Sequence, residues 1–248
     1  MLFSEKNASY RYFDIIMAFF VVVLVLSNIA SSAKIVDLGF SLFGISLAFD
    51  GGTLLFPLAY VLADILTEVY GFKASRRVIW TGFVVLAFSA LVFFVLQALP
   101  AESSWEPQDA AAIGGSITGS AAYGIILGGM SSGGIVLASL AGYLVGEFFN
   151  SVLLSRIKVI MKGRLLWFRA VTSSLVGELL DSLVFVSIAC FTGVFGWDLF
   201  ITLALTNYIL KCLIEALVLP VTYTVTRQLK KREGIDVYDV GIKYRPIG

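Results

Sequence analysis

The feature that most constrains this chain is a series of long apolar stretches. Two of them, FDIIMAFFVVVLVLSNIA in residues 13–30 and VIWTGFVVLAFSALVFFVLQAL in residues 78–99, are close to the roughly 20 residues that a helix needs to cross a bilayer. Only 14% of the residues are charged, whereas about a quarter are charged in a typical soluble domain. The sequence therefore predicts an all-α, polytopic membrane protein.

Six transmembrane helices are expected, in a single domain covering residues 1–248. The first is expected to be retained rather than cleaved as a signal peptide, because no small-residue cleavage site follows it. The fourth is long and begins with many glycines, which indicates a tilt or a break near Gly133. The expected spans are residues 11–33, 51–71, 76–99, 121–153, 169–193 and 198–227.

The basic residues predict one orientation. Sixteen of the 18 lysines and arginines precede span one, follow span six, or lie between spans two and three or four and five. These segments share one side of the bundle, and acidic residues dominate the opposite loops. The positive-inside rule then places both termini in the cytoplasm. Arg76 and Arg77, at the start of span three, are the expected topology anchor.

Composition and motifs exclude several kinds of function. The chain has no histidine, which excludes histidine metal sites and proton relays, and no metal or other cofactor is expected. Its two cysteines, Cys190 and Cys212, lie in apolar segments and are interpreted as packing residues. There is no phosphate loop, HExxH or GxSxG motif, so an enzyme is not expected. A net charge of +1 gives no indication of a nucleic-acid partner.

Ionisable side chains inside the spans are the functional candidates, because they are costly in a bilayer and usually face a protein interior or a cavity. In span two, Asp64 and Glu68 lie four residues apart on one helix face. Glu68 is near the cytoplasmic boundary, where it can reach water or pair with Arg76 or Arg77. Asp64 is deeper, which favours a functional role over a structural one.

Spans one and five carry further polar groups. Glu178 and Asp181 share a helix face deep in span five, where a structural carboxylate would need a buried partner. In span one, Asn28 lies among serines near the outer end. It either bridges helices by a hydrogen bond or binds a polar group of a substrate.

Span six presents a polar stripe of Asn207, Lys211 and Glu215 at four-residue steps. Lys211 is the only basic residue deep in a predicted span, and its ammonium can pair with a neighbouring carboxylate. Glu215 is one candidate partner, and Asp64 and Asp181 are the others. A structural alternative is an ion pair that only fixes helix packing.

Several carboxylates facing one lysine would be untenable in a dry core, so some must be protonated or the space between them must be wet. We therefore expect a polar cavity between spans two, five and six, opening toward the cytoplasm. Phe185 and Tyr208 are available to stack on a flat ligand, although packing is the commoner role for any one ring.

Two weaker patterns concern glycine and glutamate. Glu147, near the end of predicted span four, is followed by basic residues as Glu68 is in span two, which is weak support for an internal repeat. Ordinary cytoplasmic helix ends are the simpler interpretation. Two GxxxG steps, Gly124–Gly128 and Gly142–Gly146, predict close helix packing and leave a homodimer open.

The runs DGGTLLFPLAYVLADILTEVYGFKASRRVIW, GELLDSLVF and NYILKCLIEALVLP resemble the queuosine precursor transporters, a family also classed among the vitamin uptake transporters. The resemblance extends from SNIASSAK in span one to Pro220. It implies a multi-pass importer of the bacterial inner membrane. Its substrate would be a 7-deazaguanine base, in the 7-cyano or the 7-aminomethyl form.

For such a ligand, one carboxylate can accept the adjacent N–H and amine donors of the guanine-like edge, and Asp181 or Glu178 is the expected acceptor. Glu68 and Glu215 are the expected coupling or gating residues, and Asp64 either contacts the ligand or balances Lys211. The remaining roles are hydrogen bonding to the ring carbonyl by Asn28, Asn207 or Lys211 and stacking by Phe185 or Tyr208.

Two other functions stay open at this point. One is the substrate-binding subunit of an energy-coupling-factor importer, whose docking helix typically carries spaced alanines near the start of span one. Here that region contains Ala18 alone, which favours a stand-alone carrier. The other is a structural or assembly protein. Proton symport and facilitated diffusion fit the residues equally well.

Overall fold

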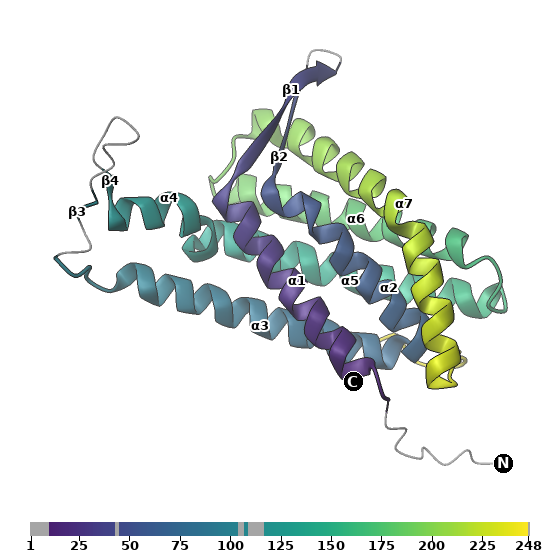
Figure 1. The fold of residues 1–248 in the computed structure, drawn as a ribbon. Coiled ribbons are helices and arrows are strands. Elements are labelled where there is room, and N and C mark those ends of the chain that lie inside the picture. The colour runs from purple at the N-terminus through teal and green to yellow at the C-terminus, as the bar shows by residue number, and fades with distance from the viewer. Residues whose placement is uncertain (1–9, 43–44, 104–106, 109–116, 248) are drawn as a thin grey trace.

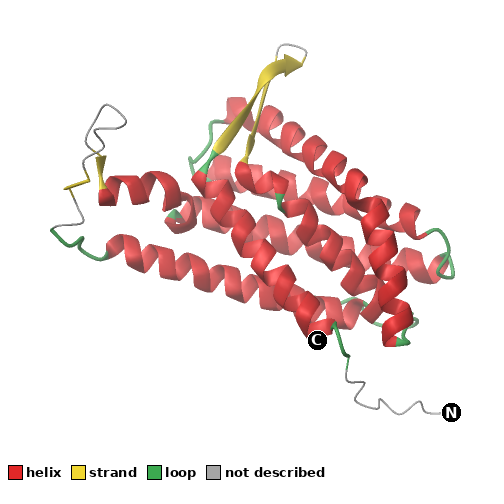
Figure 2. Ribbon diagram, in the orientation of Figure 1, coloured by secondary structure: helices red, strands yellow, loops and turns green. Residues whose placement is uncertain are grey.

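The computed structural model describes residues 10–42, 45–103, 107–108 and 117–247. Within that part of the chain, helices form the body of the molecule and the strands lie at one end of it (Figures 1 and 2). The elements are α1 (Phe13–Ala33), β1 (Ile35–Leu42), β2 (Ile45–Asp50), η1 (Gly51–Leu54), α2 (Phe56–Tyr70), α3 (Phe72–Ala98), β3 (Pro107–Gln108), β4 (Ile117–Thr118), α4 (Gly119–Ser131), α5 (Gly133–Ile160), α6 (Leu166–Phe191), η3 (Trp197–Leu199) and α7 (Phe200–Glu233).

Five of the described helical stretches are long and apolar enough to cross a membrane, namely α1, α3, α4 with α5, α6, and η3 with α7. The second predicted span is not among them, because α2 has only 15 residues, about 22 Å at 1.5 Å per residue. The expected helix start at residue 51 was wrong, since Gly51–Leu54 forms a 3-10 turn. Within the described residues, the structure thus supports a multi-pass helical membrane protein with five candidate spans, and the expected six are not confirmed.

The helix boundaries differ from the expected spans for local reasons. α3 begins at Phe72 rather than residue 76, because Gly71 turns the chain with a φ of +82° and α3 starts at the next residue. The predicted break in the fourth span is confirmed. α4 ends at Ser131, and α5 begins at Gly133 after Ser132, whose hydroxyl accepts the N–H of Ile135 at 3.5 Å.

The all-α prediction missed a hairpin. β1 and β2 pair antiparallel, with Ile35 opposite Asp50 and Leu42 opposite Ile45, in a segment that was interpreted as a loop. Figure 1 shows this hairpin at one end of the bundle, while the start of α1 and the end of α7 lie at the other. These two ends are called the hairpin end and the basic end below.

Burial in the bundle suits a lipid environment. Leu217 is 80% exposed and Phe88 is 63% exposed, and exposed apolar surface on this scale marks a membrane or partner contact. In contrast, 12 of the 15 residues of α2 are buried, including Asp64 and Glu68. The short second helix is therefore the centre of the protein, and its carboxylates face other helices rather than lipid.

One of the two GxxxG steps packs helices within the chain. A Cβ added at Gly146 would lie 2.5 Å from Tyr60 Oη and 2.9 Å from the carbonyl oxygen of Gly177 in α6. The predicted close packing is thus confirmed for Gly142–Gly146, between α5 and α6. At Gly128 in α4, by contrast, an added Cβ would meet nothing within 4 Å.

Candidate functional site

A cavity of about 370 Å³ lies inside the hairpin half of the bundle. It is bounded by the second half of α1, the start of α2, the first half of α5, the second half of α6 and the start of α7, with β2 and α4 at its edge. The expected opening toward the basic end was wrong, because that end is filled by a network of ion pairs. The polar residues of the lining are Asn28, Ser31, Ser32, Tyr60, Ser139, Tyr143, Glu147, Asp181, Asn207 and Lys211.

An ion pair crosses the wall of this cavity. Lys211 Nζ of α7 lies 2.5 Å from Asp181 Oδ2 of α6, with about a tenth of each side chain exposed. The same ammonium lies 5.0 Å from the centre of the Phe56 ring of α2, a cation–π contact. The structure therefore confirms Asp181 as the partner of Lys211 and joins three helices at this point.

An amide is held at the opposite wall. Asn28 Oδ1 accepts the hydroxyl of Ser139 at 2.5 Å, and Asn28 Nδ2 donates to the carbonyl oxygen of Leu24 at 2.9 Å. These bonds fix which way the amide points and tie α1 to α5. Asn207 and Phe185, also predicted as site residues, line the cavity as well.

Two cavity residues have polar atoms without partners. Both carboxylate oxygens of Glu147 and the hydroxyl of Tyr60 are buried and make no hydrogen bond with described residues. The sequence interpretation missed Glu147 as a site residue because it ended the helix near 153. α5 continues to Ile160, so Glu147 lies 13 residues, about 20 Å, from the helix end. Had the helix been extended to residue 160, Glu147 would have been recognised as a deep, membrane-buried carboxylate.

Five of the predicted substrate, coupling or gating residues do not line the cavity, namely Asp64, Glu68, Glu178, Tyr208 and Glu215. The carboxyl groups of Asp64, Glu178 and Glu215 lie about one helical turn closer to the basic end than Tyr60, Asp181 and Lys211, and we call them the carboxyl layer.

Two members of this layer have donors of their own. Asp64 accepts from Asn150 Nδ2 at 2.9 Å and from Ser174 Oγ at 3.3 Å. Glu178 accepts from the thiol of Cys212 at 3.0 Å. The expectation that Asp64 contacts the ligand or balances Lys211 is therefore not supported by its position and partners.

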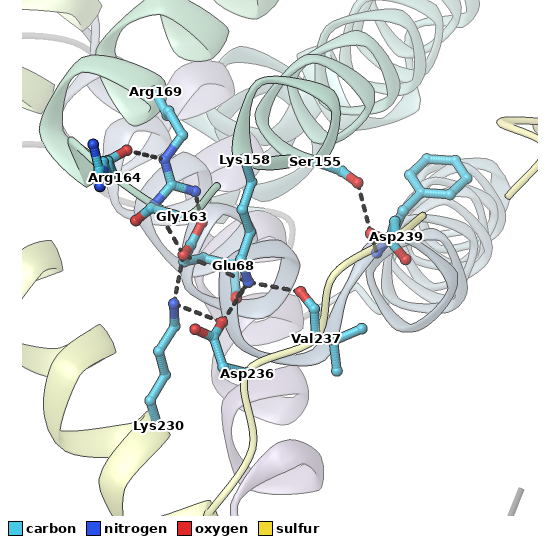
Figure 3. A network of polar contacts seen from close by, with 11 residues as sticks. Glu68, Ser155, Lys158, Gly163, Arg164, Arg169, Lys230, Asp236, Val237 and Asp239 are labelled. Carbon is cyan, nitrogen blue, oxygen red and sulfur yellow. Dashed lines mark hydrogen bonds and ion pairs between the residues drawn. The ribbon is translucent and has the colours of Figure 1, made fainter. Parts of the chain in front are cut away.

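Beyond this layer, Glu68 is the centre of the network at the basic end (Figure 3). Its carboxylate accepts two hydrogen bonds from Arg169, at 2.5 and 3.2 Å, and one from Lys230 at 2.5 Å. Lys158 Nζ lies 3.6 Å from the same carboxylate and donates to the backbone oxygen of Glu68 at 2.6 Å. α2, α5, α6 and α7 are thus held together by one buried acid.

The chain after α7 completes this network. Asp236 lies 2.5 Å from Lys158 Nζ and 2.8 Å from Lys230 Nζ, and Val237 accepts a further bond from Lys158 (Figure 3). Burial alone would raise the pKa of Asp236, but hydrogen bonds from both lysines hold it below its ordinary value. Asp239 then accepts from the N–H of Phe72 and the hydroxyl of Ser155.

The expected pairing of Glu68 with Arg76 or Arg77 was wrong. Arg76 instead donates to the backbone oxygen of Arg245 at 3.0 Å, and Arg77 is exposed. Arg169 and Lys158 had been interpreted as loop charges, yet each is at most 2% exposed. They were missed because α5 and α6 both extend further than hydropathy indicated. The longer helices bring both basic side chains into contact with the buried carboxylate of Glu68.

The chain is similar to one protein-family model and to two individual proteins. The family model described as "Putative vitamin uptake transporter" matches residues 50–225. A "Probable queuosine precursor transporter" of Bacillus subtilis (strain 168) is 24% identical over 241 residues, which cover 92% of this chain and 98% of the relative. A protein of the same name from Haemophilus influenzae is 26% identical over 177 residues, covering 70% of this chain and 66% of the relative. No solved structure matches the chain.

Proposed function

Because the chain belongs to the vitamin uptake transporter family, we propose that it carries a queuosine precursor across a membrane through the cavity between α1, α2, α5, α6 and α7. The substrate class comes from the names of the two relatives, and the family is one of transporters rather than enzymes. For this chain we propose a 7-deazaguanine base in the 7-cyano or 7-aminomethyl form.

The observation that supports this function is the composition of the cavity wall. At about 370 Å³ the cavity falls in the range of small-molecule sites, roughly 300–1,000 Å³. Phe56 and Phe185 line the cavity and provide rings on which a flat heterocycle can stack, and the amides of Asn28 and Asn207 provide donors and acceptors for its edges. The Asp181–Lys211 pair adds a charged donor for a ring carbonyl.

The proposed direction of transport rests on the charge distribution. With the basic end in the cytoplasm, the cavity lies in the outer half of the bundle and the Glu68 network closes the inner end. We propose that this arrangement is the outward-facing state of a stand-alone carrier in the bacterial inner membrane. Glu68 then acts as a gate, because its bonds to Arg169 and Lys230 must break before α6 and α7 can separate from α2.

The test is uptake in cells that cannot synthesise the precursor. Expression of this chain is expected to restore queuosine in tRNA when the 7-cyano precursor is supplied in the medium, and Lys211→Met is expected to reduce that restoration at limiting precursor. Membrane insertion of each variant, measured by immunoblot, is the control. Normal insertion without any restoration by either the 7-cyano or the 7-aminomethyl precursor would contradict the proposed substrate.

A further inference from the structure

We infer that Glu147 is the carboxylate that recognises the substrate, by accepting two adjacent N–H donors from one edge of a guanine-like base. The inference rests on the proposed function and assigns a residue that the sequence had given no role in binding. Glu147 thus takes the role of hydrogen-bond acceptor that the sequence analysis gave to Asp181 or Glu178.

Within the part of the chain that the structure describes, Glu147 is buried at the cavity without a hydrogen-bond donor of its own. Its side chain is 1% exposed and lines the cavity, and both of its oxygens lack a donor among the described residues. Burying an ionised carboxylate without a partner is highly unfavourable, because it loses its hydration and gains nothing in return. A position of this kind inside a cavity is suited to a donor that arrives from outside the protein.

Unlike Glu147, the buried carboxylates of Asp181 and Glu68 are paired with basic side chains. Asp181 is matched by Lys211 at 2.5 Å, and Glu68 by Arg169 and Lys230. A ligand donor at Asp181 would therefore compete with an ammonium already in place. Since Glu178 does not line the cavity, Glu147 is the carboxylate best placed to receive a ligand.

A guanine-like base has donors that match the two oxygens of a carboxylate. The two oxygens of a carboxylate match a pair of parallel N–H groups, as in its bidentate pairing with arginine. A guanine-like base presents such a pair, formed by the ring N1–H and the neighbouring exocyclic amine. The unpartnered hydroxyl of Tyr60 lies against Gly146, the residue before Glu147 in α5, and can bond a further polar atom of the same ligand.

The test compares two bases on the full-length purified protein. 7-Deazaguanine and 7-deazahypoxanthine differ by the exocyclic amine alone, and their affinities can be measured by calorimetry. We expect the wild type to bind 7-deazaguanine roughly 10- to 100-fold more tightly, the usual range for one hydrogen bond to a charged group. Glu147→Gln should bring this ratio close to one. Glu178→Gln, the same change in the neighbouring carboxyl layer, should retain it.

Each outcome separates the inference from the proposed function. If the wild type binds both bases equally, or if Glu147→Gln keeps the full preference, the inference is overturned while the function stands. If the wild type binds neither base nor the 7-cyano precursor, the proposed substrate class itself fails. Should Glu147→Gln not fold, as judged by its melting curve, the inference stays open to refutation, because equal binding of the two bases by the wild type would still overturn it.

Discussion

Lys211 Nζ of α7 and Asp181 Oδ2 of α6 lie 2.5 Å apart at the wall of the cavity. The pair joins α6 to α7 and presents a polar surface to the cavity. Because only about a tenth of each side chain is exposed, each charge depends largely on the other for its stabilisation.

Removing one member of this pair should destabilise the protein more than removing both. Lys211→Met leaves an unmatched buried carboxylate and is expected to cost about 3–5 kcal/mol, whereas the double variant with Asp181→Asn should recover most of that loss. Thermal unfolding in detergent measures the difference. With Asp181→Asn measured alone as well, a double variant whose loss equals the sum of the two single losses would show that the pair contributes nothing beyond its separate side chains.

The Glu68 network should be sensitive to the shape of Arg169 as well as to its charge. Arg169 forms a two-pronged contact with Glu68, and both side chains are 1% exposed. Arg169→Ala is expected to lose about 3–5 kcal/mol of stability. Arg169→Lys keeps the charge but not the fork and should fall between the wild type and Arg169→Ala. Unfolding temperatures of the three proteins provide the measurement, and an unaltered Arg169→Lys variant would count against the bidentate contact.

Asp236 predicts a specific dependence of stability on pH. Its pKa in the folded protein is lowered by Lys158 and Lys230, so its contribution is present above the ordinary aspartate pKa of about 3.9 and is lost as the pH falls through the lower, folded value. The stability difference between the wild type and Asp236→Asn should therefore be constant from pH 7 to pH 5 and shrink below about pH 4. A difference that grows on acidification would contradict this.

Glycine at position 146 should be required for the packing of α5 on α6. Gly146→Ala places a methyl group 2.5 Å from Tyr60 Oη and 2.7 Å from Asp181 Cβ, and overpacking of this kind typically costs about 1–3 kcal/mol. Gly128→Ala is the matched control, because its methyl group meets nothing within 4 Å and alanine is the better helix former. The melting temperature should fall for Gly146→Ala and should be unchanged or higher for Gly128→Ala.

The helical class was predictable because long apolar runs predict membrane helices. A lone deep lysine likewise predicts a deep carboxylate partner, but the sequence left Asp64, Asp181 and Glu215 as candidates, and the packing of α6 against α7 selects Asp181. The identity of Glu68's partners did not follow in this way. It depends on the last turn of α5 and the first turn of α6, where hydropathy falls and no longer marks the helix ends.

The hairpin and the position of Glu147 at the cavity could not be predicted for related reasons. β1 and β2 pair antiparallel with each other, which hydropathy does not reveal, and a segment between two spans is otherwise expected to be a loop. Glu147 resembles an interfacial glutamate unless the helix is known to continue to Ile160. The homodimer that the two GxxxG steps leave open stays a prediction.

We propose that this chain alone carries a queuosine precursor. The most direct measurement is uptake of labelled 7-cyano-7-deazaguanine into liposomes that contain only the purified protein, without ATP and without partner proteins. We predict saturable uptake above that of protein-free liposomes, with Glu147→Gln strongly reduced at limiting substrate. Bound precursor without any transport, or transport only after an ATPase module is added, would contradict a stand-alone carrier.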